Sequence, residues 1–159
     1  MQEVSVVIPN FNGMAYLDGV LSSLERQTIR NFEVILVDNG STDGSCAFVS
    51  AEYPWVHMIQ LQENYGFSRA VNEGIHAERS PYVLLLNNDT EAEPDFLEEM
   101  VAALRRHKKA FSCQARMIQL HDRDKMDDAG NYYCALGWAF ARGKGKDISH
   151  YDREQKIFS

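Results

Sequence analysis

The stretch "FEVILVDNGSTDGS" (32–45) decides the fold class. Its first seven residues are apolar apart from Glu33 and the closing Asp38, and a cluster of turn-forming residues follows them. A strand that is apolar at nearly every position is typical of a parallel sheet covered on both faces. The stretch therefore predicts a buried parallel strand at 32–38, then a turn, then a short helix through Val49.

Further apolar runs lie on both sides of this strand, and segments with helical periodicity separate them. We predict the other strands at 4–8, 55–61, 82–86 and 110–118. Apolar residues three or four positions apart predict three helical faces, namely Leu17, Val20, Leu21 and Leu24; Phe67, Ala70, Val71 and Gly74; and Leu97, Met100, Val101 and Leu104. Because strands and helices alternate, the sequence predicts an α/β, Rossmann-like fold with a mostly parallel sheet flanked by helices.

The bulk composition is that of an acidic globular chain. The chain has 159 residues, of which 45% are hydrophobic and 25% charged, and its formal net charge is −7. This charge argues against nucleic acid as a partner. The three cysteines are few and far apart, which predicts reduced thiols and no disulfide framework. The α/β pattern ends near residue 119, so we predict a main domain at 1–119 and a loop-rich region at 120–159.

Polar residues follow three of the predicted strands at the point where each strand ends. Asn10 and Asn12 follow the first strand, Asp38 closes the second, and Asn87–Asp89 follow the strand at 82–86. Parallel sheets bind ligands beyond the carboxyl ends of their strands. We therefore expect these side chains to face one crevice.

The residue types at these strand ends fit two interpretations each. Asp89, beside an amide and a hydroxyl, suits Mg²⁺ or Mn²⁺, which prefer oxygen ligands, and it equally suits a cap for the next helix. Asp38 can accept hydrogen bonds from a base or ribose, or it can form the turn in "DNGSTDG". The loops "PNFNG" (9–13) and "ENYG" (63–66) can contact a nucleotide or simply precede helices. The P-loop spacing, a Gly-x-Gly-x-x-Gly after the first strand and a Gly-x-Ser-x-Gly elbow are all absent from the sequence.

Taken together, four segments resemble the inverting glycosyltransferases of family 2, which have a GT-A type fold and include rhamnosyltransferase-like enzymes. The segments are "VSVVIPNFNG", "FEVILVDNGSTDGS", "ENYGFSRAVNEGI" and "YVLLLNNDT", in that order. The resemblance covers residues 3–119. It implies a domain at 1–119 that binds the nucleotide-sugar donor and the start of an acceptor-side region at 120–159.

The resemblance implies a role for each matching residue. The residues that would bind the nucleotide sugar are Pro9, Phe11, Asn12, Asp38, Asn64, Gly66, Asn87 and Asn88. Asp38 would meet a uracil or thymine edge, and Asp89 would hold Mg²⁺ or Mn²⁺. Asn87-Asn88-Asp89 matches the family's Asp-x-Asp motif, but Asn87 replaces the first Asp, so Asp89 is the only carboxylate of the motif.

The resemblance also implies a reaction, namely transfer of a sugar, with inversion, from a UDP- or dTDP-linked donor to a hydroxyl of a saccharide or lipid-linked acceptor. The setting would be bacterial cell-surface polysaccharide synthesis in the cytoplasm, with peripheral association at the inner face of the membrane. The family's general base lies on a Glu-Asp-type segment that has no match after Gln119, and Asp127 and Asp128 are the stand-in candidates. We therefore interpret the chain as the amino-terminal part of a longer enzyme, and we expect it alone to bind donor without efficient transfer.

Two other functional classes fit parts of the pattern. A nucleotidyltransferase also joins a nucleotide-binding sheet to an acidic metal site, but it would ordinarily carry a basic, glycine-rich loop after the first strand. The loop "NFNG" (10–13) has one glycine and no basic residue. A non-enzymatic docking module would use the polar strand ends only as turns, and it would show no change in melting temperature with nucleotides.

Overall fold

The computed structural model describes residues 2–136, 138–155 and 157. Contacts within the chain divide it into two compact units, Met1–Glu99 and Met100–Ser159. The sequence pattern puts the boundary at 119, about twenty residues later. The predicted and the observed boundary differ because the sequence pattern assigns a strand to 110–118, whereas the last strand of the parallel sheet along the chain is 82–85. None of the described helices combines the length and the apolar character needed to cross a membrane.

The first unit contains a four-stranded parallel sheet in the order β3-β2-β1-β4. Its strands are β1 (Val4–Asn10), β2 (Phe32–Asp38), β3 (His57–Gln60) and β4 (Tyr82–Leu85). In register, Asn10 lies beside Asp38, and Asp38 lies beside Gln60. The carboxyl ends of the two central strands therefore finish level with one another, as the predicted crevice requires.

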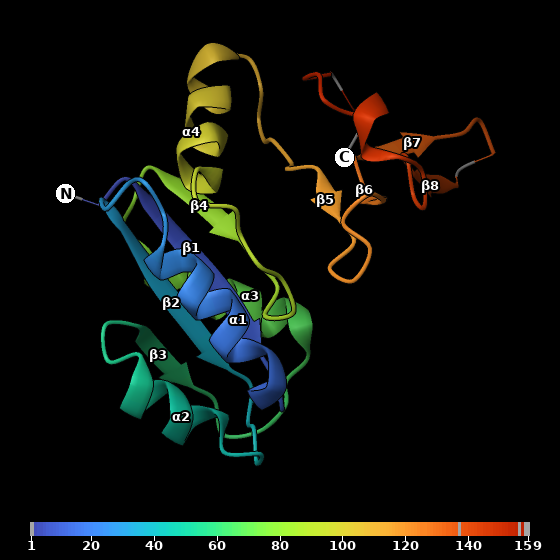
Figure 1. Ribbon diagram of the computed structural model, residues 1–159. Coiled ribbons are helices and arrows are strands. Elements are labelled where there is room, and N and C mark those ends of the chain that lie inside the picture. The colour runs from blue at the N-terminus through green and yellow to red at the C-terminus, as the bar shows by residue number, and fades with distance from the viewer. Residues whose placement is uncertain (1, 137, 156, 158–159) are drawn as a thin grey trace. The chain divides into compact units, whose positions relative to one another are not determined.

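Helices cover both faces of this sheet. They are α1 (Met14–Glu25), α2 (Ser45–Glu52) and α3 (Phe67–Ala77), each following the strand before it. Figure 1 shows α1 in front of the sheet and α3 behind it, and α3 contacts both central strands while α1 and α2 contact each other. This arrangement confirms the predicted mostly parallel sheet flanked by helices.

The core forms where the predicted apolar stripes meet the sheet. Leu17, Val20, Leu21 and Leu24 of α1 are all fully buried, as are the apolar residues at 34–37 of β2. Gly74 lets α3 lie close to the sheet, because a Cβ there would come within 2.3 Å of the Val7 side chain. A side chain at this position would therefore push the helix away from β1.

Three local predictions were wrong. Phe67 is 63% exposed, because it is the first residue of α3 and lies before the face that Ala70 and Val71 bury. The strand predicted at 55–61 is shorter at both ends. The strand predicted at 110–118 is reduced to two residues outside the parallel sheet, since 110–116 contain no β-branched residue to favour extended pairing.

The second unit contains short elements. Helix α4 (Phe96–Arg106) begins before the boundary between the units, and β5 (Met117–Ile118) then pairs antiparallel with β6 (Met126–Asp128). A hairpin of β7 (Asn131–Tyr133) and β8 (Ala139–Ala141) follows, and η1 (Ile148–His150) is a single 3₁₀ turn. These pairs replace much of the irregular region predicted at 120–159.

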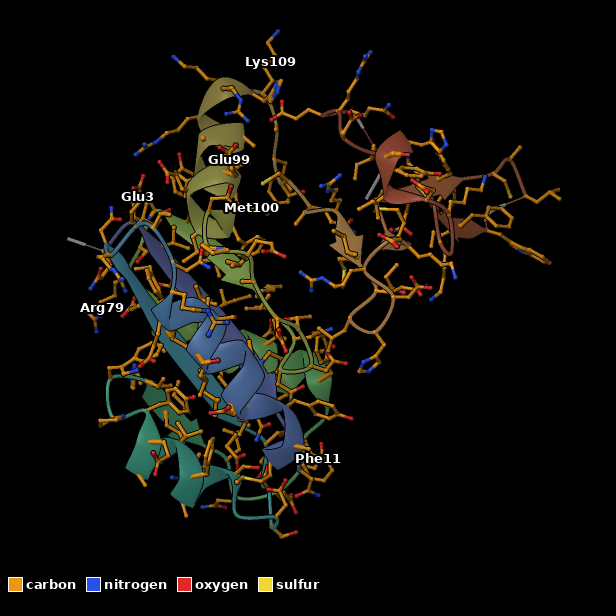
Figure 2. The ribbon with its side chains drawn as sticks, viewed as in Figure 1. Glu3, Phe11, Arg79, Glu99, Met100 and Lys109 are labelled. Atoms are coloured by element: carbon orange, nitrogen blue, oxygen red, sulfur yellow. The ribbon has the colours of Figure 1, made fainter. Side chains whose placement is uncertain are left out.

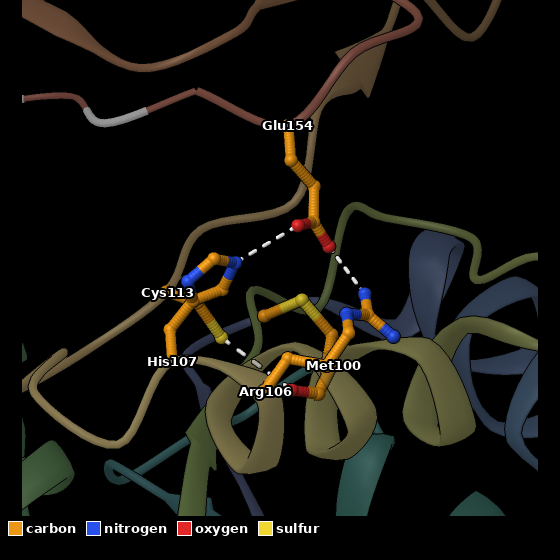
Figure 3. A network of polar contacts seen from close by, with 5 residues as sticks. All are labelled: Met100, Arg106, His107, Cys113 and Glu154. Atoms are coloured by element: carbon orange, nitrogen blue, oxygen red, sulfur yellow. Dashed lines mark hydrogen bonds and ion pairs between the residues drawn. The ribbon is translucent and has the colours of Figure 1, made fainter.

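A network of polar contacts joins Glu154 to the last turn of α4 and the residue after it. In Figure 3 the Glu154 carboxylate accepts hydrogen bonds from Arg106 and from His107, whose Nε2 lies 3.0 Å away. The Cys113 thiol donates to the Met100 carbonyl at 3.7 Å. The bond with His107 and the one with Arg106 lower the pKa of Glu154. All three cysteines are free.

Candidate functional site

The carboxyl edge of the sheet is organised by Asn10, the last residue of β1. Its amide nitrogen donates to the Asp38 carboxylate at 2.9 Å, and its amide oxygen accepts from the Asn88 side chain at 2.8 Å. Asn10 and Asp38 are 1% and 2% exposed, so the bond between them is shielded from water, and the bond from Asn88 is partly buried. Buried polar groups of this kind persist only when they are paired. The chain Asp38–Asn10–Asn88 thus joins the exits of β2, β1 and β4.

A second set of bonds ties the loop after β1 to the loop after β2. The backbone N–H of Asn12 donates to the Ser41 hydroxyl, and the Asn12 amide oxygen accepts from the backbone N–H of Thr42, both at 2.8 Å. Asn12 has a φ of 50°, a left-handed conformation that asparagine tolerates better than most residues. At the start of α1, the backbone N–H of Met14 donates to the Asp43 carboxylate at 2.9 Å.

A third set of bonds brings in the loop before α3. The Asn39 amide donates to the Asn64 side-chain oxygen at 2.9 Å and to the Gly66 carbonyl at 3.2 Å. Its own oxygen accepts from the backbone N–H of Tyr65 at 3.0 Å. Asn39 is buried and was not among the predicted site residues, although its position directly after an apolar strand was an available signal.

Asp38 is held as a carboxylate inside this network. Burial raises the pKa of Asp38, but hydrogen bonds from the Ser41 hydroxyl and backbone and from Asn10 outweigh burial and lower it. Burial, together with a hydrogen bond to Asp38, raises the pKa of the neighbouring Cys46 thiol to about 11. Asp38 is therefore charged and Cys46 neutral at neutral pH.

The loop after β4 supplies the exposed groups of the site. Asn87 and Asp89 are exposed, whereas Asn88 turns inward to reach Asn10. The Thr90 hydroxyl donates to the Asn87 carbonyl at 2.7 Å, which closes the turn. Gly13 lies against this contact, because a Cβ there would come within 2.1 Å of the Asn88 amide nitrogen and 2.3 Å of the Asn10 oxygen.

Aromatic rings stand exposed on the same loops. Phe11 is 47% exposed and Tyr65 is 49% exposed. In Figure 2, Phe11 lies at the opposite end of the first unit from Glu3 and Arg79, which mark the amino-terminal end of the sheet. A base can stack on such rings, while the loop amides and hydroxyls offer partners for ribose and phosphate oxygens.

The structure brings most of the predicted site residues to one edge. Pro9, Phe11, Asn12, Asp38, Asn64, Gly66, Asn87, Asn88 and Asp89 all lie at or beyond the carboxyl ends of the strands, or on loops bonded to those ends. The stand-in bases lie in the second unit, where Asp128 accepts from Gln114 at 3.1 Å and Asp127 lies 3.6 Å from the Lys144 ammonium. Their role as a general base stays a prediction.

Asp89 is the exposed carboxylate that the sequence predicts as a metal ligand at this edge. No group of three or more His, Cys, Asp and Glu side chains gathers anywhere in the described part of the chain. Mg²⁺ is commonly bound through one or two carboxylates together with substrate phosphates. An exposed carboxylate beside Asn87 and Asn88 therefore fits a divalent cation that a diphosphate ligand helps to hold.

A doubly wound sheet with a closely bonded polar carboxyl edge places the chain among the α/β proteins whose ligands bind beyond the carboxyl ends of the strands. Within this class, residues 5–157 match the family model described as glycosyl transferase family 2. The chain belongs to this family.

The chain is also similar in sequence to curated glycosyltransferases. The chain is 34% identical over 101 residues to a putative glycosyltransferase EpsH of Bacillus subtilis, a match that covers 62% of this chain and 29% of EpsH. It is 28% identical over 128 residues to a putative teichuronic acid biosynthesis glycosyltransferase TuaG of the same organism, with 78% and 50% covered. The chain thus spans half or less of the length of these relatives.

Solved structures confirm the GT-A type fold. Residues covering 74% of this chain superimpose on 38% of S. aureus TarS 1-349 in complex with UDP-GlcNAc, with a TM-score of 0.62 and 22% identity. The mannosyltransferase PcManGT of Pyrobaculum calidifontis, in complex with GDP-Man and Mn²⁺, matches with a TM-score of 0.59 and 24% identity over 64% of this chain and 32% of its own.

Proposed function

We propose that the first unit binds the nucleotide diphosphate of a sugar donor, UDP- or dTDP-linked, and that the enzyme to which this chain belongs transfers the sugar to a hydroxyl acceptor with inversion. The observation that carries the proposal is the network Asp38–Asn10–Asn88, which holds three strand exits together at the carboxyl edge. The hydrogen-bonded loops leave Asn64, Asn87 and Asp89 exposed, where a ligand can reach them.

The division of labour within the site follows from burial. Asn10 and Asp38 are buried and hydrogen-bonded to each other and to the loop after β2, so their contribution is to hold the loops in place. Asp38 can in addition meet the base edge, as the family resemblance implies, only through the small part of its carboxylate that remains exposed. The side chains of Phe11 and Asn64 are exposed and are the stronger candidates for direct contact with the nucleoside.

Asp89 is the residue that would hold Mg²⁺ or Mn²⁺ with the donor diphosphate. When bound, such a cation neutralises the charge that develops on the leaving diphosphate. The support from this chain is an exposed carboxylate at the exit of β4, and the support from a protein of the same fold is PcManGT, whose structure is a complex with GDP-Man and Mn²⁺. Deprotonation of the acceptor hydroxyl requires a carboxylate base, for which Asp127 and Asp128 are the candidates.

The setting of the reaction is also part of the proposal. Relatives named for teichuronic acid biosynthesis and for cholesterol galactosylation point to surface glycans or lipids as acceptors. We place the enzyme in the cytoplasm, at the inner face of the plasma membrane, in cell-surface polysaccharide synthesis.

Calorimetry with UDP and dTDP in the presence of Mn²⁺ tests this proposal. We expect binding by the wild-type chain and at least a tenfold loss of affinity for Asp89→Ala. Glu91→Ala is the matched control, because it removes an exposed carboxylate two residues away and should leave the affinity unchanged. Absence of binding to wild type, or equal losses for the two variants, would contradict the proposal. Tighter binding of a nucleoside triphosphate than of either diphosphate would favour a nucleotidyltransferase.

A further inference from the structure

The second unit contains a hollow of about 500 Å³, within the range of small-molecule sites. Its lining residues are Tyr132, Ala141, Arg142, Gly143, Lys144, Lys146, His150, Tyr151 and Gln155. All of them belong to the segment after β6, so the hollow is formed within the second unit alone. None of these residues takes part in the donor site described above.

The charge of this hollow is opposite to that of the whole protein. The chain carries a net charge of −7, yet residues 129–146 include Arg142, Lys144 and Lys146 and no acidic residue. The Lys144 ammonium lies 3.6 Å from Asp127. Among the described residues, no carboxylate pairs with Arg142 or Lys146. Arg142 and Lys146 therefore line the hollow without an ion pair to a described carboxylate.

Arg142 is held in place before any ligand arrives. Its guanidinium donates to the Ala129 carbonyl at 3.2 Å and lies over the Tyr151 ring, 4.9 Å from the centroid. A planar guanidinium fixed in this way retains further N–H groups that suit two oxygens of one phosphate.

The turn that carries the lysines is anchored as well. The Lys146 backbone N–H donates to the Gly143 carbonyl, the Lys146 carbonyl accepts from Met126, and the Gly145 backbone N–H donates to the Met126 carbonyl, each at 2.8 Å. Met126 is fully buried. The backbone of the turn is thus fixed to β6, while the Lys146 ammonium makes no ion pair with a described carboxylate and can reach a ligand.

We propose that this hollow binds the phosphate or diphosphate group of the acceptor substrate. The inference rests on the proposed glycosyltransferase function and names a chemical class for its acceptor, a phosphate-bearing saccharide or lipid. Several cations around one cavity favour a multiply charged anion over a single carboxylate. The Tyr132 and Tyr151 side chains add hydroxyl groups that can bond phosphate oxygens.

Calorimetry of the full chain with inorganic pyrophosphate tests the inference, with UDP held at saturation so that the donor site is filled. We expect Arg142→Gln and Lys146→Gln each to weaken pyrophosphate binding at least tenfold and to leave the affinity for UDP unchanged. Lys146→Gln is the more decisive variant, because no described side-chain contact of Lys146 supports the fold. Lys109→Gln, at an exposed lysine after α4 (Figure 2), is the control for a simple loss of charge and should change the affinity less than twofold.

Each other outcome overturns the inference. Unchanged binding by Lys146→Gln, or an equal loss for Lys109→Gln, would show that the hollow is not an anion site. Loss of pyrophosphate binding when UDP is added would assign the cations to the donor. The membrane is tested with vesicles of equimolar phosphatidylcholine and phosphatidylglycerol, to which all variants should bind alike. A vesicle-binding defect without a pyrophosphate defect would assign the cations to lipid headgroups. UDP binding is measured separately, so failure here leaves the donor proposal standing.

Discussion

Replacing Asn10 by Asp tests the central hydrogen-bond network most severely. In the wild-type protein the Asn10 amide nitrogen lies 2.9 Å from the Asp38 carboxylate, and both residues are almost completely buried. The Asn10→Asp variant would place two carboxylates at this distance and would remove one donor. With an effective dielectric constant of about 20, two unit charges so placed repel by roughly 6 kcal/mol.

Local rearrangement and proton uptake make the loss of unfolding free energy smaller than this repulsion energy. We expect the Asn10→Asp variant to lose roughly 3–5 kcal/mol of unfolding free energy at neutral pH, as when a buried charge loses its partner. The loss should shrink on acidification toward about pH 5, because the repulsion raises the pKa of one carboxylate and protonation relieves it. Wild type behaves in the opposite sense, since the lowered pKa of Asp38 contributes stability above its unfolded value of 3.8 and loses it as the pH falls through the folded value.

Urea unfolding followed by circular dichroism at several pH values measures both effects. Asn64→Asp is the matched control, because the Asn64 oxygen only accepts hydrogen bonds, from Asn39 and the backbone of Gly66, and a carboxylate can accept the same bonds. We expect that variant to be nearly as stable as wild type. Equal stabilities of Asn10→Asp and wild type at neutral pH, or a stability deficit that grows on acidification, would show that Asn10 and Asp38 are not coupled in this way.

Three further predictions follow from individual contacts. Gly13→Ala should weaken nucleotide binding, measured by calorimetry, because its Cβ would come within 2.1 Å of the Asn88 amide nitrogen. With a pKa raised from 9.0 to about 11, native Cys46 should react with iodoacetamide at pH 8 roughly a hundredfold more slowly than in urea, as followed by mass spectrometry. Gln27→Ala should cost roughly 1–3 kcal/mol in urea unfolding, because the Leu97 backbone N–H donates to the buried Gln27 oxygen at 2.9 Å. Nucleotide binding by Gly13→Ala as tight as that of wild type would contradict the first expectation, and equal reaction rates of Cys46 in native and unfolded protein would contradict the second. Wild-type stability of Gln27→Ala would contradict the third.

The fold could be predicted where burial alone determines structure. The strand at 32–38 has the predicted bounds, because a run that is apolar on both faces has no stable alternative to a covered sheet. The stripe that begins at Leu17 is buried as predicted, because one period describes the whole of α1. The strand prediction for 110–118 was wrong because the few apolar residues of this segment do not form one buried face. Phe111, for example, is fully exposed.

The location of the site could be predicted, but its internal bonding could not. Strand ends are marked by a change from apolar to polar residues, which is why Asp38 and Asn88 were identified. The bonds from Asn39 to the loop at 64–66 and from Asp43 to α1 depend on how separate loops meet in space. No local sequence pattern predicts contacts of this kind between separate loops.

Titration of the ¹⁵N-labelled chain with UDP and Mg²⁺, followed by NMR, shows where on the chain the nucleotide binds. We expect chemical-shift changes concentrated in the loops at 10–14, 38–43, 64–66 and 87–90, with signals near Asp89 broadened when Mn²⁺ replaces Mg²⁺. Changes confined to the amino-terminal edge around Glu3 and Arg79, or no broadening near Asp89, would contradict this expectation.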